Sequence, residues 1–242
     1  MKKVVLISGG AKRIGESTAS FLHEKGFNII FTYNKSKPEA KLLKNKLNSI
    51  RDNSCDMIQA SFDSKTNYSN LSKKIISIFG RVDHLVNNAS KFYPTKMNDI
   101  NDKNWLDIMD TNTKAPLFLS KAFTEELRRR KGSIINIIDI HVEPPLKDHI
   151  IYNISKAGLL ALTRSLAKDL APGIRVNGVS PGAIMWPENE SSKKKKNDIM
   201  SKIPMKRTGS PDDIARTILF LIHSSYITGQ NINVDGGRRL NM

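Results

Sequence analysis

A tyrosine and a lysine stand four residues apart in the stretch YNISK, at Tyr152 and Lys156. Within a helix, side chains at positions i and i+4 share one face, so the phenol and the ammonium group would lie next to each other. A free tyrosine has a pKa of about 10, and a nearby cation lowers that pKa because it favours the phenolate. We therefore expect Tyr152 to pass a proton to a bound substrate at neutral pH.

Two further polar residues occupy positions that require an explanation. Asp139 closes the apolar run 134–138, where a carboxylate needs a partner or a function. It is either a catalytic neighbour of Tyr152 or a turn aspartate that caps the next segment. Asn112 falls inside a long predicted helix, although asparagine is unfavourable in helix interiors. It is therefore either a catalytic residue or the mark of a local irregularity in that helix.

A glycine-rich segment, SGGAKRIG at residues 8–15, follows the first apolar run of the chain. Glycines allow a tight turn, and the N-terminus of a following helix offers free N–H groups and partial positive charge to a phosphate. The spacing is not G-x-G-x-x-G, so an ordinary strand-to-helix turn is the alternative. Lys12 and Arg13 add positive charge, and we predict that the segment binds the phosphates of a dinucleotide.

The end of the second apolar run indicates which dinucleotide is bound. Its residues are Tyr33, Asn34, Lys35 and Ser36. An NAD site carries a carboxylate here for the ribose 2′-hydroxyl, whereas a basic residue suits the 2′-phosphate of NADP. No acid is present, and Lys35 and Ser36 can both donate hydrogen bonds to phosphate. We therefore predict NADPH as the cofactor, against the alternative that these residues are only solvated surface.

The elements that position these residues alternate along the chain. Short apolar runs, several rich in Val and Ile, are typical of strands buried on both faces. We predict strands at 3–7, 28–33, 56–60, 84–87, 133–139, 175–179 and 231–234. We predict helices at 13–25, 37–50, 66–79, 101–130, 151–171 and 211–223. The last helix has Ser210 as its N-cap and Pro211 as its first residue.

This order predicts an α/β fold, in which one parallel, doubly wound sheet carries helices on both faces. We predict a single domain over 1–242, because no linker or repeat divides the chain. Ligands of such sheets bind at the carboxyl ends of the strands. The irregular stretch 183–206, with a turn at 187–190, is predicted to be a flexible flap over that end. Its lysine run 193–196 is predicted to be exposed and extended, because adjacent cations repel one another.

Composition and charge exclude several classes of function. The net charge is +16, but the basic clusters 128–131 and 193–196 contain no interleaved aromatic residues for base stacking. We therefore predict no nucleic-acid partner. No apolar run reaches the roughly 18 residues of a membrane helix, and the run 4–7 is too short for a signal peptide, so we predict a cytoplasmic protein. The single Cys55 is interpreted as a small core residue. We predict no metal site and no membrane contact.

Taken in order, these motifs resemble those of the short-chain dehydrogenases/reductases over nearly the whole chain. The matching pieces are the segment 8–15, Asn87-Asn88-Ala89, Asn112, Tyr152-x-x-x-Lys156, Arg175-Val176-Asn177 with Pro181-Gly182, and Asp235-Gly236-Gly237. The resemblance implies a Rossmann-type sheet of about seven strands and a homotetramer. It also implies that Tyr152 donates the proton, that Lys156 holds the nicotinamide ribose and lowers the tyrosine pKa, and that Asn112 supports a proton-relay water.

Departures from the common pattern resemble one subfamily, the pteridine reductases, together with the bacterial dihydromonapterin reductases of the same group. Most relatives have glycine where this chain has Arg13 and serine where it has Asp139, and the pteridine reductases share both changes. They also share the segment 87–90 followed by FYP at 92–94. The resemblance implies that Phe92 stacks on a pterin ring, and that Ser90 and Arg13 contact both the pterin and the cofactor phosphate. The implied substrate-binding residues are Arg13, Ser90, Phe92, Asp139 and Tyr152.

The same resemblance assigns the cofactor contacts. Ser61 stands where many relatives place an aspartate against the adenine, and Asp63 follows two residues later. The implied NADPH-binding residues are Gly9, Arg13, Ile14, Tyr33, Asn34, Lys35, Ser36, Ser61, Phe62, Asn88, Ala89, Ser90, Tyr152, Lys156, Pro181, Gly182 and Ile184.

The expected reaction is hydride transfer from NADPH to a C=N bond of a dihydropterin, such as dihydrobiopterin, dihydromonapterin or dihydrofolate. The first alternative is a carbonyl reductase, such as a 3-oxoacyl carrier-protein reductase. Asp139 argues against it, because a hydroxyl donor suits a developing alkoxide better than a carboxylate does. The second alternative is a non-catalytic NADPH sensor, against which the retention of Tyr152, Lys156 and Asn112 argues.

Overall fold

Seven parallel strands form one sheet in the computed structural model, which describes residues 2–185 and 193–242. The sheet order is β3-β2-β1-β4-β5-β6-β7, so the chain winds outward from β1 in one direction and from β4 in the other. The strands are β1 (Val4–Ile7), β2 (Asn28–Tyr33), β3 (Cys55–Gln59), β4 (His84–Asn87), β5 (Ser133–Ile137), β6 (Arg175–Pro181) and β7 (Asn231–Val234). The predicted doubly wound α/β fold is confirmed.

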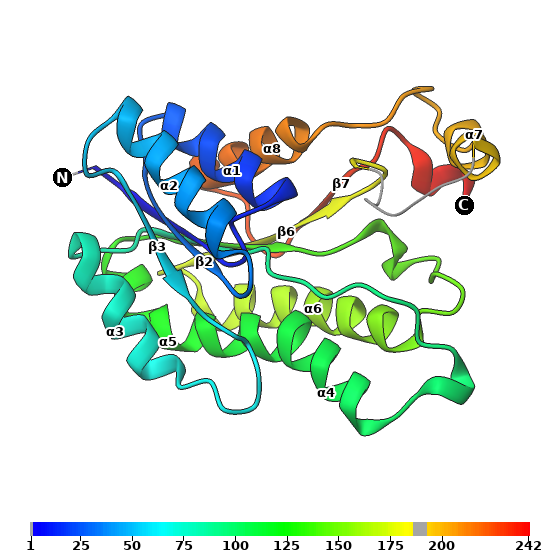
Figure 1. The fold of residues 1–242 in the computed structure, drawn as a ribbon, viewed down its shortest axis with the longest axis horizontal. Coiled ribbons are helices and arrows are strands. Elements are labelled where there is room, and N and C mark those ends of the chain that lie inside the picture. The colour runs from blue at the N-terminus through cyan, green and yellow to red at the C-terminus, as the bar shows by residue number, and fades with distance from the viewer. Residues whose placement is uncertain (1, 186–192) are drawn as a thin grey trace.

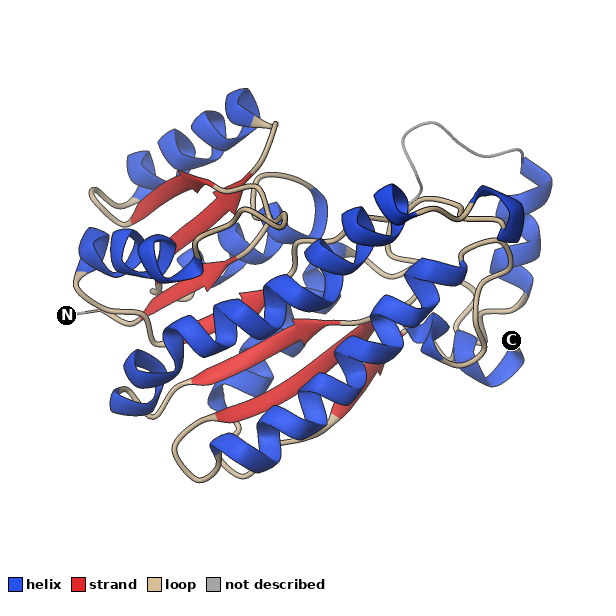
Figure 2. Cartoon of the chain, turned by 90° about the horizontal axis from the view of Figure 1, so that it is seen from below, coloured by secondary structure: helices blue, strands red, loops and turns tan. Residues whose placement is uncertain are grey.

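Helices cover both faces of this sheet (Figure 1). One layer holds α1 (Arg13–Glu24), α2 (Lys37–Ile50) and α8 (Pro211–His223). The other holds α3 (Tyr68–Phe79), α4 (Asp102–Met109), α5 (Ala115–Arg129) and α6 (Ile150–Leu170). Figure 2 looks at the sheet from the side of the second layer. No helix among residues 2–185 and 193–242 is long and apolar enough to cross a membrane.

The central strand β1 shows why two layers form. All four of its residues are fully buried. Val5 and Ile7 pack into the apolar cluster with α1, α2 and α8, whereas Val4 and Leu6 pack into the cluster with α3 and α5. Successive strand residues point to opposite faces, so an uninterrupted apolar run must be covered on both sides.

The predicted helix over 101–130 is interrupted in its middle. Between α4 and α5, residues Asp110–Lys114 form a π-helical turn that contains Asn112. The side chain of Asn112 bonds to two neighbouring segments there, as described below, and these tertiary contacts favour the wider turn. The prediction of one regular helix was wrong, and the alternative that Asn112 marks an irregularity is confirmed.

The lysine run 193–196 is also different from the prediction. It opens the helix α7 (Lys193–Ser201) and is not extended. Lysine has a high helix propensity, and the helix ends with an i,i+4 ion pair between Lys202 and Asp198 at 3.4 Å. The predicted turn at 187–190 lies outside the described residues.

Candidate active site

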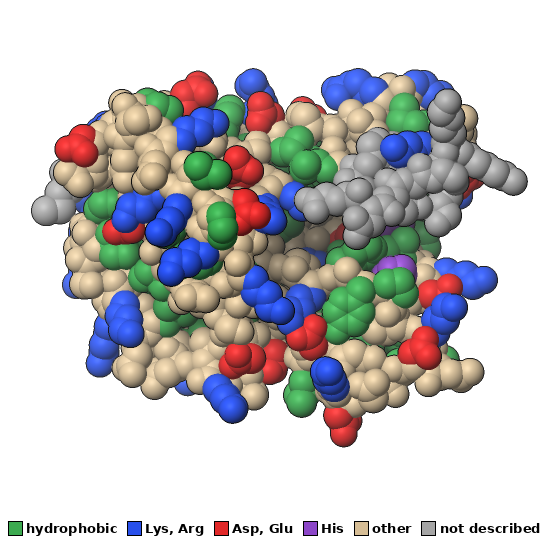
Figure 3. All heavy atoms as spheres, viewed as in Figure 1, with side chains coloured by type: hydrophobic (Ala, Val, Ile, Leu, Met, Phe, Trp, Pro, Cys, Tyr) green, Lys and Arg blue, Asp and Glu red, His purple; other side chains and the backbone are tan. Residues whose placement is uncertain are grey.

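A cleft of about 890 Å³ opens at the carboxyl ends of the strands. Figure 3 shows it as a hollow with Lys and Arg side chains at its rim. The predicted site residues that line it are Gly9, Arg13, Ile14, Tyr33, Asn34, Lys35, Ser61, Phe62, Asn88, Ala89, Ser90, Phe92, Asp139, Tyr152, Lys156, Pro181, Gly182 and Ile184. Two predicted residues do not line the cleft. Ser36 lies at the N-cap of α2, and Asn112 is fully buried.

The glycine-rich turn after β1 is fixed against the two neighbouring strand ends. Gly9 has φ of +65°, and a Cβ on it would lie 2.9 Å from the Cα of Ala89, so only glycine suits this position. The N–H of Gly9 donates to Thr32 Oγ1 at 3.1 Å, and the amide of Asn88 donates to the carbonyl oxygen of Gly9 at 2.9 Å. The turn therefore leads the chain directly into α1, whose N-terminus faces the cleft.

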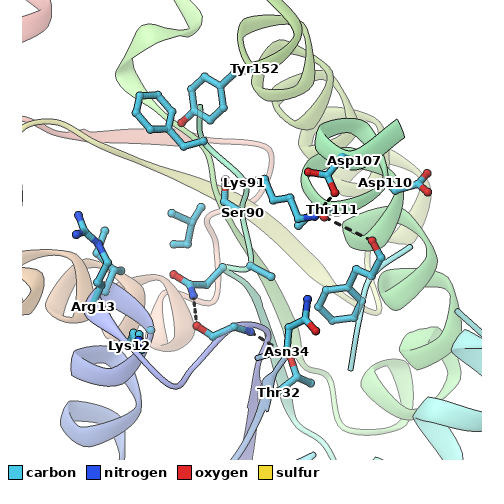
Figure 4. A pocket seen from close by; sticks show the side chains of 18 of the residues that line it. Lys12, Arg13, Thr32, Asn34, Ser90, Lys91, Asp107, Asp110, Thr111 and Tyr152 are labelled. Atoms are coloured by element: carbon cyan, nitrogen blue, oxygen red, sulfur yellow. Dashed lines mark hydrogen bonds and ion pairs between the residues drawn. The ribbon is translucent and has the colours of Figure 1, made fainter. Parts of the chain in front are cut away.

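Arg13 begins α1 in the left-handed region, with φ of +54°. That region favours glycine, which explains in physical terms why an arginine at this position is a departure. Lys12 and Arg13 lie on one side of the cleft, across from Tyr152 (Figure 4). Lys12 also forms an ion pair with Glu39 of α2 at 2.7 Å.

The segments after β2 and β3 line the same half of the cleft as the glycine-rich turn and the start of α1. Asn34 and Lys35 are exposed there, and no carboxylate stands in the segment 33–36. Phe62 is mainly a core residue, 8% exposed and stacked on Tyr68. Asp63, which the sequence places two residues after the expected position, lies in the cleft, and the Ser61 hydroxyl donates to it at 2.9 Å. That hydrogen bond lowers the pKa of Asp63.

This half of the cleft has the donors that a dinucleotide needs. A helix N-terminus with two cations faces the position of a pyrophosphate. Lys35, in a segment 33–36 that has no carboxylate, stands at the end of β2, where a bound ribose would lie. The residues present therefore fit a nicotinamide dinucleotide.

At the other half of the cleft, the Tyr152 hydroxyl donates to Oδ2 of Asp139 at 2.5 Å. The second oxygen of the same carboxylate accepts from the backbone N–H of His141 at 2.8 Å, which caps a short 3-10 turn at Ile140–Val142. Asp139 therefore caps a turn, as one interpretation predicts, and it also contacts the Tyr152 hydroxyl.

The pKa of Tyr152 is raised well above its ordinary value, first because the phenol is buried and then because Asp139 carries negative charge beside it. The expectation of a lowered pKa was wrong for this structure. Asp139 touches the hydroxyl, whereas Nζ of Lys156 lies 5.8 Å from the centre of the tyrosine ring. Lys156 is fully enclosed, and burial lowers its pKa to about 8, although the charge of Asp139 opposes that change. Its Nζ donates to the carbonyl of Ile137 at 2.9 Å.

The side chain of Asn112 connects two segments of the site through hydrogen bonds. Its Oδ1 accepts from the N–H of Lys91 at 2.7 Å, and its Nδ2 donates to the carbonyl of Lys91 at 2.9 Å and to Oγ of Ser155 at 3.0 Å. Ser155 belongs to α6, the helix that carries Tyr152 and Lys156. The side-chain amide of Asn112 therefore holds the segment after β4 against α6.

Phe92 follows directly on that segment, and its side chain is 56% exposed in the cleft. Phe92 is therefore not a core residue. Its ring meets Tyr152 edge to face, with centroids 4.8 Å apart and planes at 78°. On another side it stacks on His149, with centroids also 4.8 Å apart and planes at 16°. Sequence reasoning missed His149, although its position three residues before Tyr152 was a usable signal.

The fold and this arrangement define a reductase of the short-chain type, and comparison with known proteins agrees. Residues 9–239 match the family described as Enoyl-(Acyl carrier protein) reductase. The chain belongs to the short-chain dehydrogenase/reductase family, and it is an oxidoreductase, as the sequence predicts. Reductases of this family use a nicotinamide cofactor.

Two kinds of relatives are similar to nearly the whole chain. Pteridine reductase 1 of Leishmania tarentolae is 34% identical, over 98% of this chain and 96% of its own. The 3-oxoacyl-(acyl-carrier-protein) reductase FabG of Staphylococcus epidermidis is 36% identical, over 98% and 99%. The same-named protein of Staphylococcus aureus is 35% identical, over 98% of each chain. Overall identity therefore does not separate pterin from carbonyl substrates, and the separation depends on individual residues.

Proposed function

We propose that this protein is an NADPH-dependent reductase that converts a dihydropterin to its tetrahydro form. The observation that carries the proposal is the 2.5 Å hydrogen bond from the Tyr152 hydroxyl to the Asp139 carboxylate. A carboxylate here can accept hydrogen bonds from the amino group and ring N–H of a pterin. It is poorly suited to an alkoxide, because both would carry negative charge.

The shape of the site supports a flat substrate. Phe92 presents an exposed ring at the cleft, and Tyr152 meets the edge of that ring. Aromatic rings stack favourably in offset, parallel arrangements. A pterin held against Phe92 would have its polar edge near Asp139 and Tyr152, and stacking would hold the reacting ring in attack geometry.

When bound, NADPH supplies the hydride that reduces the C=N bond. Tyr152 carries its proton at neutral pH, as a tyrosine of ordinary pKa also does, and it would donate that proton toward the ring nitrogen, directly or through water, although the raised pKa makes it a weaker acid. Asp139 orients the phenol. Lys156 would hold the nicotinamide ribose, while Pro181, Gly182 and Ile184 would line the nicotinamide.

Several residues support NADPH over NADH. Lys35 is exposed at the end of β2 without a carboxylate in the segment 33–36, and Lys12 and Arg13 add positive charge nearby. A ribose 2′-phosphate gains from such surroundings, whereas an unmodified ribose finds no carboxylate in the segment 33–36 for its 2′-hydroxyl. Ser36 does not line the cleft in this structure, so Lys35 is the residue on which this proposal rests.

A second candidate is a carbonyl reductase acting on a 3-oxoacyl thioester. It is favoured by the FabG relatives, whose identity to this chain is as high as that of the pteridine reductase. It is disfavoured by Asp139 and by the exposed Phe92 ring, since a flexible acyl chain does not need a flat aromatic wall.

We also propose a cytoplasmic homotetramer that folds as one domain. The flap predicted at 183–206 lies partly outside the described residues, and its described part includes α7. Exposed apolar side chains on α5, Leu117 and Phe118, support a subunit contact on that helix. The lone buried Cys55 suits a reducing compartment. Molar mass in solution, measured by light scattering after gel filtration, tests the oligomeric state.

The experiment that tests the function compares substrates side by side. NADPH oxidation is followed with dihydrobiopterin, dihydromonapterin, dihydrofolate and acetoacetyl thioester, using one preparation of the protein. Higher kcat/KM on a dihydropterin than on the thioester is the expected result. A preference for the thioester would replace the proposal with the second candidate.

A further inference from the structure

The stack of His149 on Phe92 is a feature that the reaction described above does not use. Their rings lie nearly parallel, with centroids 4.8 Å apart and planes at 16°. Phe92 lines the cleft but His149 does not. The imidazole therefore covers one face of the phenyl ring and is itself outside the lining of the cleft.

The backbone holds these two rings in register. Thr95, three residues after Phe92, forms a parallel bridge with His149. The N–H of Thr95 donates to the carbonyl of Asp148 at 2.6 Å, and Oγ1 of Thr95 accepts from the N–H of Ile151 at 3.2 Å. Thr95 is only 1% exposed, so the bridge is protected from water.

The imidazole itself is fixed in orientation. Nδ1–H of His149 donates to the carbonyl of Lys147 at 2.7 Å. The residue between them, Asp148, has φ of +61°, in the left-handed region that aspartate adopts more readily than most residues. It forms the turn that carries His149 to the ring of Phe92.

We infer that His149 is a positioning residue for substrate specificity, which acts by holding the Phe92 ring as a fixed flat wall for a planar heterocycle. This inference rests on the proposed pterin reductase function. An exposed phenylalanine without a backing ring would move among rotamers, and a ligand would have to fix it at an entropic cost on binding. When His149 stacks on Phe92, the Phe92 ring is already ordered before a ligand binds.

Two substitutions at position 149 separate the ring from its hydrogen bond. His149→Asn keeps a donor for the Lys147 carbonyl and loses the ring, whereas His149→Phe keeps a ring and loses the donor. Aromatic pairs are worth a few tenths to about 1.5 kcal/mol, so loss of the stack should raise the dihydropterin KM roughly two- to tenfold. We expect this change in His149→Asn with kcat nearly unaltered, and near wild-type KM in His149→Phe. The affinity of the NADP⁺ complex for biopterin, measured by pterin fluorescence, should change in the same way.

A double-mutant cycle with Phe92→Ala tests whether His149 acts through Phe92. We expect His149→Asn to add no further increase in pterin KM when Phe92 is already alanine. An equal increase in both backgrounds, or harm from His149→Phe as large as from His149→Asn, would overturn the inference. NADPH affinity and the thermal midpoint are measured for every variant, and a variant with a lowered midpoint is assessed at a temperature where it is folded.

Failure of the proposed function gives a different pattern. If Phe92→Ala leaves pterin affinity unchanged and the wild type prefers the acetoacetyl thioester, the pterin function itself is wrong. If Phe92→Ala weakens pterin binding but His149→Asn does not, the function stands and the role of His149 is wrong.

Discussion

The hydroxyl of Tyr152 lies 2.5 Å from Oδ2 of Asp139, whereas Nζ of Lys156 lies 5.8 Å from the centre of the tyrosine ring. The tyrosine is therefore paired with an anion in this structure, although it stands one helical turn from a cation. This pairing makes the proton of Tyr152 harder to remove, and its consequences can be measured.

Asp139→Asn should lower the pKa of Tyr152. The substitution keeps an oxygen acceptor near the phenol but removes the negative charge that raises the pKa together with burial. Alkaline titration of phenolate absorption, taken as the difference between each protein and its Tyr152→Phe counterpart, isolates this one group. An unchanged titration would mean that burial alone sets the pKa. We also expect the variant to lose most dihydropterin turnover.

Tyr152→Phe should lower kcat on the preferred substrate by roughly 10²- to 10⁴-fold, the usual contribution of a positioned acid. NADPH binding, followed by nucleotide fluorescence, should remain within about twofold, because Lys156 and the phosphate-binding residues are untouched. Near-normal turnover would assign the proton to a water molecule beside Asp139.

Lys35→Asp should weaken NADPH binding and spare NADH. A hydrogen bond to a charged group is worth about 1.5–3 kcal/mol, which corresponds to a loss of roughly ten- to a hundredfold in affinity. Lys37→Asp is the matched control, since Lys37 is exposed two residues away and does not line the cleft. Equal losses in both variants would indicate a general effect of charge, and equal wild-type affinity for the two nucleotides would rule out the NADPH preference.

Substitutions of Arg13 should separate its role in binding from its effect on stability. Arg13→Gly and Arg13→Ala both remove the guanidinium, so both should weaken NADPH binding. Only glycine relieves the left-handed backbone, with φ of +54°. The free energy of unfolding should therefore be higher for the glycine variant than for the alanine variant, by about 1 kcal/mol. Chemical denaturation of the two variants measures it, and a more stable alanine variant would contradict the assignment of strain.

His84→Asn should reduce the loss of stability in acid. Burial lowers the pKa of His84 from its ordinary value to about 3, so the folded protein keeps this residue neutral. The unfolded chain binds a proton there as the pH falls below about 6.5, and the free energy of unfolding therefore falls between that pH and about 3. Asparagine retains a partner for Ser133, which His84 contacts at 2.9 Å. Thermal midpoints at neutral and acid pH should differ less in the variant than in wild type, and an equal difference in both proteins would contradict the prediction.

The fold and most of the cleft residues could be predicted from the sequence because they depend on local patterns. The apolar run of β1 requires two covering layers, and the four-residue spacing of Tyr152 and Lys156 survives in α6. The π-helical turn at Asn112 could not be predicted, because it depends on bonds to Lys91 and Ser155 that only the folded chain supplies.

Two errors have the same origin. The pKa of Tyr152 is raised first by burial and then by the charge of Asp139, and spacing along the chain shows neither the burial of the phenol nor its contact with Asp139. The role of His149 depends on its contact with Phe92, a residue far away in sequence, and on the bridge at Thr95 that brings them together. Patterns within one element are informative about that element, but not about how two loops meet.

The strand order reverses between β1 and β4, and this point also separates two sets of cleft residues along the chain. The cleft residues proposed to hold the phosphates and the adenine follow β1, β2 and β3, and all of them precede β4. The aromatic wall, the carboxylate and the tyrosine come after β4, together with the residues proposed to hold the nicotinamide. Exchange of the region beyond β4 between homologous reductases should therefore transfer the proposed pterin wall together with the nicotinamide contacts, while the glycine-rich turn and Lys35 stay with the recipient.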